Sequence, residues 1–352
     1  MSLYDRYLNG IISYEDYYKE VSYFTFMLVR GYSSYYNHTE EDFLNMLEND
    51  YKFFNPSERE EVLNYYGPHV DKELMRKVYF EEKEKREKEF TFDDSRIIKE
   101  TNDKNIEILS TRGLIREKNE DFAAVIDKGE YKLLVLCDGA GGTLGGDAAS
   151  KALVATIVDY FKNKNMNLHE CMGEVFELSR VNILNSTKTG VTTLTMALVT
   201  PSNTYVYNIG DSRTYYVKDN HLVQITNDDN YIWDLYLLGK VSKEDLRFIR
   251  DKGYLTTYAE GLNRWDYKVE THVISDYDGL FLCSDGVSSV LSDNTLEELL
   301  LKEDSIKNIL TSSTLGEMDA YHGEIIENPR GIVHGNDNAT AIYMKLKKRS
   351  KK

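Results

Sequence analysis

Cysteine and proline are scarce in this chain of 352 residues, which contains three cysteines and four prolines. The odd number of cysteines, with no CxxC pair and no zinc-like spacing, argues against a disulfide framework and against a zinc site. Cys137 and Cys283 end apolar runs, where cysteine acts as a small core residue. We therefore expect a protein of the reducing cytoplasm.

Long apolar runs and an excess of basic over acidic residues are also lacking. No stretch of about 18 apolar residues is present, and the first residues, MSLYDRYLNG, lack a basic region followed by an apolar one. The net charge of −16 argues against a nucleic-acid partner. The terminal stretch KLKKRSKK is the basic exception, and it is either a solvated end or a contact with an anionic surface. We expect no membrane partner and no nucleic-acid partner.

The first 95 residues have the pattern of helices, and no residue among them suggests chemistry. Apolar side chains follow the three-four spacing of one helical face at Tyr14, Tyr17, Tyr18, Val21, Phe24 and Leu28. Thirteen of the 27 tyrosines lie before residue 80, which fits either an interaction surface or the core and rim of a small bundle. The charged stretch EEKEKREKEF then reads as a linker or a solvated helix end. We expect a helical region over 1–95 of unknown role, a second domain over 96–348 and a basic tail over 349–352.

Beyond residue 105 the pattern mixes short strands with two helices, at about 146–162 and 168–186. Strand-like runs occur at 105–110, 122–126, 131–137, 191–199, 204–209, 214–217, 222–225, 268–274, 280–283 and 339–346. Asp219-Asn220 fits a two-residue hairpin turn. Several connections are short, and short connections imply antiparallel pairing. The sequence therefore predicts an α+β layered domain.

Acidic residues stand at four of these strand ends. In LLVLCDGAGG (133–142) an apolar run stops at Asp138, and LFLCSDG repeats the pattern with Asp285. Asp337 precedes the last strand, and Glu120-Asp121 precede the strand that starts at residue 122. A single Asp-Gly pair is an ordinary turn. Four acidic strand ends in one domain are harder to explain as turns, because like charges brought together need cations to balance them.

Carboxylates without histidine or cysteine suit hard divalent cations such as Mg²⁺ or Mn²⁺. The glycine after Asp138 allows a backbone carbonyl to turn into the site. Two such cations sharing a carboxylate and a water form the arrangement used for in-line attack on phosphorus. Arg116 is then a candidate clamp for phosphate, and the alternative is a surface ion pair with Glu117 or Glu120.

Six motifs resemble, in order and spacing, those of the PP2C (PPM) family of metal-dependent serine/threonine phosphatases. They are REKNED (116–121), CDGAGG (137–142), GVTTLTMALV (190–199), NIGDSRTYYV (208–217), LCSDGV (282–287) and NDNAT (336–340). The resemblance covers residues 105–348. It is strongest to the bacterial branch, because residues 225–249 resemble the flap region of that branch. It implies an αββα sandwich, in which two packed antiparallel β-sheets are flanked by helices.

The resemblance also implies roles for single residues. Asp138 would bridge two cations, with Asp285 and Asp337 completing the first site, and Glu120 and the carbonyl of Gly139 completing the second. Arg116 matches the phosphate-binding arginine. Four further residues would contact the ligands without binding a cation, or would hold a turn between two central strands: Asp121, Asp211, Arg213 and Asn338.

Three positions depart from the family pattern. Ala140 replaces a methionine or histidine, and Asp229 replaces a histidine at the start of the flap. Thr187 stands where an acidic residue often helps to bind a third ion. A third ion should therefore bind weakly, with Asp228, Asp229 and Asp234 of the flap as substitute ligands.

By this resemblance the chain is a cytoplasmic protein serine/threonine phosphatase of signalling. It would hydrolyse phosphomonoesters by in-line attack of a water that bridges two Mn²⁺ or Mg²⁺ ions. Phosphorylated proteins are the expected partners, with residues 1–95 as a possible contact for a regulatory partner. Two alternatives remain open: a pseudophosphatase or phosphoprotein-binding scaffold without turnover, and a purely structural domain.

Overall fold

The computed structural model describes residue 88 and residues 90–113, 116–140, 145–163, 168–243, 246, 255–315 and 337–346. The helices expected before residue 87 and the basic tail lie outside the described residues. Within the described part of the chain, none of the helices combines the length and the apolar character needed to cross a bilayer.

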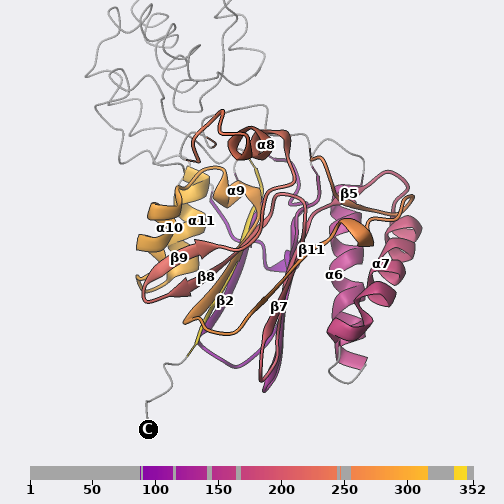
Figure 1. Ribbon diagram of the computed structural model, residues 1–352, viewed down its shortest axis with the longest axis horizontal. Coiled ribbons are helices and arrows are strands. Elements are labelled where there is room, and N and C mark those ends of the chain that lie inside the picture. The colour runs from indigo at the N-terminus through magenta and orange to yellow at the C-terminus, as the bar shows by residue number, and fades with distance from the viewer. Residues whose placement is uncertain are drawn as a thin grey trace, which may run out of the picture. The chain divides into compact units, whose positions relative to one another are not determined.

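Two β-sheets form the centre of the fold (Figure 1). The six-stranded sheet has the order β1 (Ile97–Glu100), β3 (Phe122–Lys128), β4 (Tyr131–Cys137), β6 (Leu194–Val199), β7 (Thr204–Ile209) and β11 (Glu270–Ile274). The five-stranded sheet has the order β2 (Ile106–Thr111), β13 (Ala339–Lys345), β12 (Gly279–Cys283), β8 (Arg213–Lys218) and β9 (His221–Gln224). A small antiparallel pair joins β5 (Val191–Thr192) to β10 (Ala259–Glu260).

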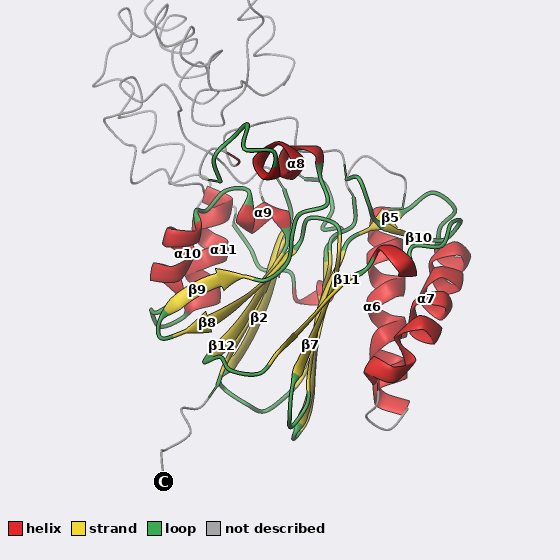
Figure 2. Ribbon diagram, in the orientation of Figure 1, coloured by secondary structure: helices red, strands yellow, loops and turns green. Residues whose placement is uncertain are grey.

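Helices flank both sheets (Figure 2). The six-stranded sheet is covered by α6 (Gly146–Asn163) and α7 (Met172–Ser186), and the five-stranded sheet by α10 (Asp293–Leu300) and α11 (Ser305–Leu315). Two short helices, α8 (Tyr231–Leu237) and α9 (Asp285–Ser288), follow strands β9 and β12. Single turns of 3-10 helix occur at Asp94–Arg96, Leu168–Cys171 and Asp266–Lys268.

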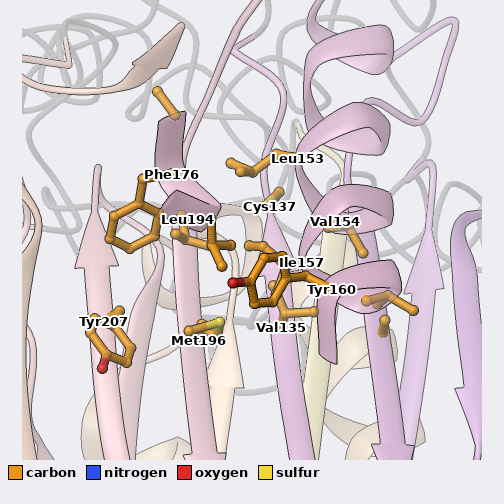
Figure 3. Packing of buried hydrophobic residues seen from close by; sticks show 14 of the residues in the cluster. Val135, Cys137, Leu153, Val154, Ile157, Tyr160, Phe176, Leu194, Met196 and Tyr207 are labelled. Carbon is orange, nitrogen blue, oxygen red and sulfur yellow. The ribbon is translucent and has the colours of Figure 1, made fainter. Parts of the chain in front are cut away.

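Strand β4 shows why the two layers form. Its side chains alternate, so that Leu133, Val135 and Cys137 face α6, whereas Leu134 and Leu136 face the other sheet. Figure 3 shows the helix side of this core, with Leu153, Val154, Ile157 and Tyr160 of α6 above the strands. Strand β4 therefore buries both of its faces, which explains its continuous apolar run.

The structure confirms the α+β sandwich and most predicted elements. The Asp219-Asn220 turn joins β8 to β9, and both residues have positive φ, 51° and 68°. The predicted strand 191–199 is interrupted at Thr193, and the second helix begins at Met172 after a turn of 3-10 helix. Among the strands that the structure describes, one pair is not antiparallel: β1 lies parallel to β3. The chain between these two strands passes through β2 in the other sheet.

Pairing brings the predicted acidic strand ends to one edge of the sandwich. In the first sheet Phe122 lies opposite Cys137, so Asp121 and Asp138 leave the ladder at the same end. In the second sheet Cys283 lies opposite Ala341, which places Asp285 beside the residues that enter β13. This edge is the candidate site.

Candidate metal centre

The main chain of Asp138 is held by Thr192, the last residue of β5, and by Thr193, which lies between β5 and β6. Its N–H donates to the hydroxyl of Thr193 at 2.9 Å. Its carbonyl accepts the N–H of Thr193 and the hydroxyl of Thr192, both at 2.8 Å. Since these contacts use the main chain, the carboxylate is left to the site.

Gly139 lies where three backbone segments meet. Its N–H donates to the carbonyl of Glu120 at 3.2 Å. A Cβ at this position would lie 2.5 Å from the carbonyl of Gly146 and 2.7 Å from that of Glu120. Only glycine fits, and the close approach places Glu120 beside the Asp138-Gly139 peptide.

Asn338 ties the entrance of β13 to the loop that carries Glu120. Its side-chain amide donates to the carbonyls of Arg112 (2.9 Å) and Lys118 (2.8 Å), and its side-chain oxygen accepts the N–H of Glu120 at 2.8 Å. This buried residue therefore holds Asp337 and Glu120 at fixed separation along the main chain.

Ser284 joins the two sheets beneath the acids. Its hydroxyl donates to Asp121 Oδ2 at 2.9 Å and accepts the N–H of Thr340 at 3.0 Å. A Cβ on Gly286 would lie 1.9 Å from the carbonyl oxygen of Asn338, so the strand end that carries Asp285 packs directly against the residue after Asp337. The main-chain segments that carry these carboxylates therefore pack tightly against one another.

The carboxylates converge on Asp138. Burial raises the pKa of Asp138 well above its usual range, and the neighbouring charges of Asp121, Asp285, Asp337 and Asp211 raise it further. Burial likewise raises the pKa of Asp121 to about 7. Ionising all of these groups together requires positive charge in their midst.

Arg116 belongs to this cluster. Its Nη2 donates to Asp337 Oδ2 at 2.6 Å, so Arg116 forms an ion pair, but with Asp337 and not with the Glu117 or Glu120 of the alternative interpretation. Burial acts to lower the pKa of Arg116, but the charges of Asp337, Asp285 and Asp138 outweigh it and raise the pKa. The guanidinium is therefore placed at the acidic centre and remains partly exposed to incoming ligands.

The predicted donor set has the ligand chemistry that hard divalent cations prefer. It consists of the carboxylates of Glu120, Asp138, Asp285 and Asp337 and the carbonyl of Gly139, with no nitrogen or sulfur ligand. As placed, no three His, Cys, Asp or Glu side chains of the described residues stand close enough to hold an ion. Because the Asp337 carboxylate lies against Arg116, the fit rests on the chemistry of the donors and on their common location.

Asp211 lies in the turn from β7 to β8, which crosses between the sheets at the same edge, and Arg213 is the first residue of β8. Asp211 accepts a hydrogen bond from the side-chain amide of Asn230 at 3.3 Å. Arg213 is buried and donates two hydrogen bonds to Asp228, at 2.7 and 2.6 Å. The turn therefore fixes the first residues of the flap segment 225–249.

Two of the three substitute ligands predicted for a third ion already accept hydrogen bonds from the protein. Both oxygens of Asp228 accept hydrogen bonds from Arg213, and Asp229 Oδ2 accepts the N–H of Gly210 at 2.9 Å. Asp234 is exposed on α8. A weak third ion stays a prediction.

Thr187→Asp tests this prediction. The Thr187 hydroxyl accepts the N–H of Gly190 at 3.0 Å, and an aspartate can keep that acceptor while adding charge. We expect Thr187→Asp to bind a third Mn²⁺ at a lower concentration than the parent, as measured by anomalous diffraction. Thr187→Asn has the same shape without the charge and should behave like the parent. Three fully occupied ions in the parent at modest Mn²⁺ would contradict the prediction.

Several supporting residues were not predicted from the sequence. Ser284 and Thr193 are short polar residues without a distinctive signal, and their role follows only from long-range packing. Asp147 opens α6; the pKa of Glu120 is raised first by burial and then by the charge of Asp147. The position of Asp147, just after a glycine-rich loop and at a helix start, was the one available sequence signal.

The chain is similar to known serine/threonine phosphatases in sequence and in fold. The serine/threonine phosphatase stp of Listeria welshimeri is 30% identical over 232 residues, covering 62% of this chain and 91% of the relative. The solved serine/threonine phosphatase PstP/Ppp of Mycobacterium tuberculosis has a TM-score of 0.56 at 25% identity, covering 69% of this chain and 98% of that chain. The PstP catalytic domain in complex with two manganese ions shows the same fold, with a TM-score of 0.52 at 24% identity, covering 69% of this chain and 98% of that chain. A model of the protein phosphatase 2C family matches residues 116–315. The chain belongs to the protein phosphatase 2C family.

Proposed function

We propose that the chain is a metal-dependent phosphatase that hydrolyses phosphoserine and phosphothreonine in proteins. The observation that carries the proposal lies at one edge of the sandwich, in a member of this family: the charges of Asp285 and Asp337 act on the buried carboxylate of Asp138, and the Glu120 carbonyl accepts the N–H of Gly139. The catalytic domain of PstP forms a complex with two manganese ions, which supports Mn²⁺ as the cation, and Mg²⁺ has the same preference for oxygen ligands.

The predicted ligands would be distributed over two cations. Asp138 would be shared by both cations, with Asp285 and Asp337 on one and Glu120 and the Gly139 carbonyl on the other. When bound, such a pair supplies a water nucleophile at neutral pH and neutralises charge on the phosphoryl oxygens. Arg116 offers its planar guanidinium to the phosphoryl group, which would replace the contact with Asp337.

A covalent phosphoenzyme is disfavoured. Burial raises the pKa values of the Cys137 and Cys283 thiols far above their usual range, so neither is a thiolate at neutral pH. The Ser284 hydroxyl is engaged with Asp121 and Thr340. The cysteines and the serine of these motifs are therefore not set up as nucleophiles, which favours direct attack by water.

Hydrolysis of a small aryl phosphate tests the proposal. We expect turnover with Mn²⁺ or Mg²⁺ and its loss on addition of a chelator. Asp337→Asn should remove the activity, whereas Asp276→Asn, which changes an exposed carboxylate, should not. A parent protein that stays inert with every divalent cation would favour the scaffold without turnover.

Finer features of the function are also proposals. The substrates of this chain are phosphoproteins, since its relatives are serine/threonine phosphatases. Its three free cysteines fit the cytoplasm, where it would act in signalling. Residues 1–95 would contact a regulatory partner, as inferred from the tyrosine-rich sequence.

Arg116→Ala is expected to raise the KM for phosphopeptide about ten-fold or more, because a hydrogen bond from a charged donor contributes about 1.5–3 kcal/mol. The Mn²⁺ concentration needed for activity should not rise, since removing Arg116 frees Asp337 for the cation. Steady-state kinetics at several Mn²⁺ concentrations measures both quantities. Arg112→Ala, which removes an exposed arginine four residues earlier, is the control. An unchanged KM would leave Arg116 as an ion-pair partner of Asp337 only.

A further inference from the structure

Residues 91–100 precede the family match, which begins at residue 116, and they contact strands that lead to the acidic edge of the sandwich. The carbonyl of Thr91 accepts the hydroxyl of Thr111 at 2.7 Å, and the N–H of Asp93 donates to the carbonyl of Ser110 at 2.8 Å. Strand β1 then runs parallel to β3, with Ile97 opposite Ala123. Residues 91–100 therefore lie along the strands whose ends carry the acidic residues.

The main chain of Glu120 is held by partners from three separate segments. Its N–H is bound by the side chain of Asn338 at 2.8 Å. Its carbonyl accepts the N–H of Gly139 at 3.2 Å and the hydroxyl of Ser150 at 2.5 Å. These contacts fix the peptide groups on either side of the Glu120 Cα, and so set the direction of its carboxylate.

The next carbonyl, that of Asp121, is held by Arg96. Arg96 Nε donates to it at 2.9 Å, and the guanidinium carbon lies 5.3 Å from the centre of the Phe122 ring. Phe122 is buried, so the ring provides a firm surface. Arg96 Nη2 is buried and has no hydrogen-bond partner among the described residues, so the carbonyl and the ring are the contacts that place this side chain.

We propose that Arg96 is a positioning residue for the second cation. By fixing the Asp121 carbonyl it holds the Asp121-Phe122 peptide, which is the next one after the Glu120-Asp121 peptide, and thereby limits movement of the main chain that carries Glu120. The inference rests on the proposed two-cation centre. Because Glu120 serves one cation whereas Asp138 is shared, loss of Arg96 should weaken one of the two ions selectively. Loss of a residue that orients a ligand typically lowers metal affinity about 10–100-fold.

Mn²⁺ binding to the full chain, followed by electron paramagnetic resonance of the free ion, tests the inference. The parent should bind two ions, and Arg96→Ala should bind one of them about ten-fold more weakly or worse. The concentration of Mn²⁺ giving half-maximal activity should rise by the same factor, with kcat at saturating Mn²⁺ nearly unchanged. Arg96→Lys, which keeps the charge and one donor, should fall between the two.

Lys128→Ala is the matched control at the other end of β3. Lys128 Nζ donates to the carbonyls of Phe161 (2.9 Å) and Lys162 (2.8 Å) and lies 5.1 Å from the Phe161 ring centre. Lys128→Ala therefore removes hydrogen bonds to backbone carbonyls and a contact with an aromatic ring, as Arg96→Ala does, but at a position away from the acidic edge. We expect its thermal stability to fall while Mn²⁺ affinity holds.

Four results would overturn the inference. Mn²⁺ affinity in Arg96→Ala could equal that of the parent, or fall no more than in Lys128→Ala; either result makes Arg96 merely structural. In a Glu120→Gln background, a further fall on adding Arg96→Ala would show that Arg96 does not act through Glu120. A parent that binds no Mn²⁺ would remove the two-cation centre itself, and the proposed function with it. Two bound ions in the parent, with unchanged affinity in Arg96→Ala, would reject the role of Arg96 alone.

Discussion

Asp138→Asn is expected to abolish binding of both cations and to lower phosphatase activity by about 10²–10³-fold or more. The substitution keeps the shape of the side chain and removes the charge around which the other carboxylates gather. Metal affinity and turnover should fall together, because a shared ligand serves both sites. Calorimetric titration with Mn²⁺ and an aryl phosphate assay measure the two effects.

Asp127→Asn is the control for Asp138→Asn. Asp127 lies at the opposite end of the β3–β4 pair, where it accepts a hydrogen bond from Lys132 at 2.5 Å. Its loss removes one carboxylate from the same sheet, and Mn²⁺ binding should hold. Turnover by Asp138→Asn at the parental rate, with the same Mn²⁺ requirement, would contradict the assignment of this residue.

Arg213→Ala is expected to lower the free energy of unfolding by about 3–5 kcal/mol, because it leaves the buried carboxylate of Asp228 without its partner. Both side chains of the pair are less than one-tenth exposed, at 9% and 8%. Arg213 also lies 5.4 Å from the Trp233 ring of α8, so the start of the flap should loosen as well. Denaturant unfolding measures the free energy, and Trp233 fluorescence follows the flap.

Arg264→Ala provides the comparison for Arg213→Ala. Arg264 also donates two hydrogen bonds to one carboxylate, Asp266, at 3.0 and 2.7 Å, but its side chain is 70% exposed. An exposed pair of this kind contributes about 0–1 kcal/mol. Equal losses in the two variants would show that burial does not set the importance of the Arg213 pair.

The layered fold was predictable because its strands carry strong local signals. The apolar runs that end at Cys137 and Cys283 bury both faces, and Asp219-Asn220 is a turn pair that tolerates positive φ. Strand β1 was missed, since its four residues, IIKE, bury little and pair with a strand beyond an intervening one. Sequence periodicity is weak in so short an edge strand.

Helices α8 and α10 were missed although their caps are visible in the sequence. Asn230 accepts the N–H of Trp233, and Ser292 accepts that of Thr295, as N-cap side chains do. Both residues follow segments without a clear helical period. The N-cap residues are therefore the local signal in the sequence for both helices.

The acidic residues of the centre were predictable, but their partners were not. An aspartate that interrupts an apolar run is visible locally, as at Asp138 and Asp285. The contact from Arg116 to Asp337 spans most of the domain, and the roles of Ser284 and Arg96 depend on how β1, β3 and β12 pack. Such long-range contacts follow from tertiary packing, which no local pattern encodes.

Anomalous diffraction from crystals of the full chain grown with Mn²⁺ tests the two-cation centre most directly. We predict two peaks about 3.5–4 Å apart. Both should lie on the Asp138 carboxylate, one with Asp285 and Asp337 and the other with Glu120 and the Gly139 carbonyl. A single peak, or two peaks whose ligands do not include Asp138, would contradict the two-cation centre.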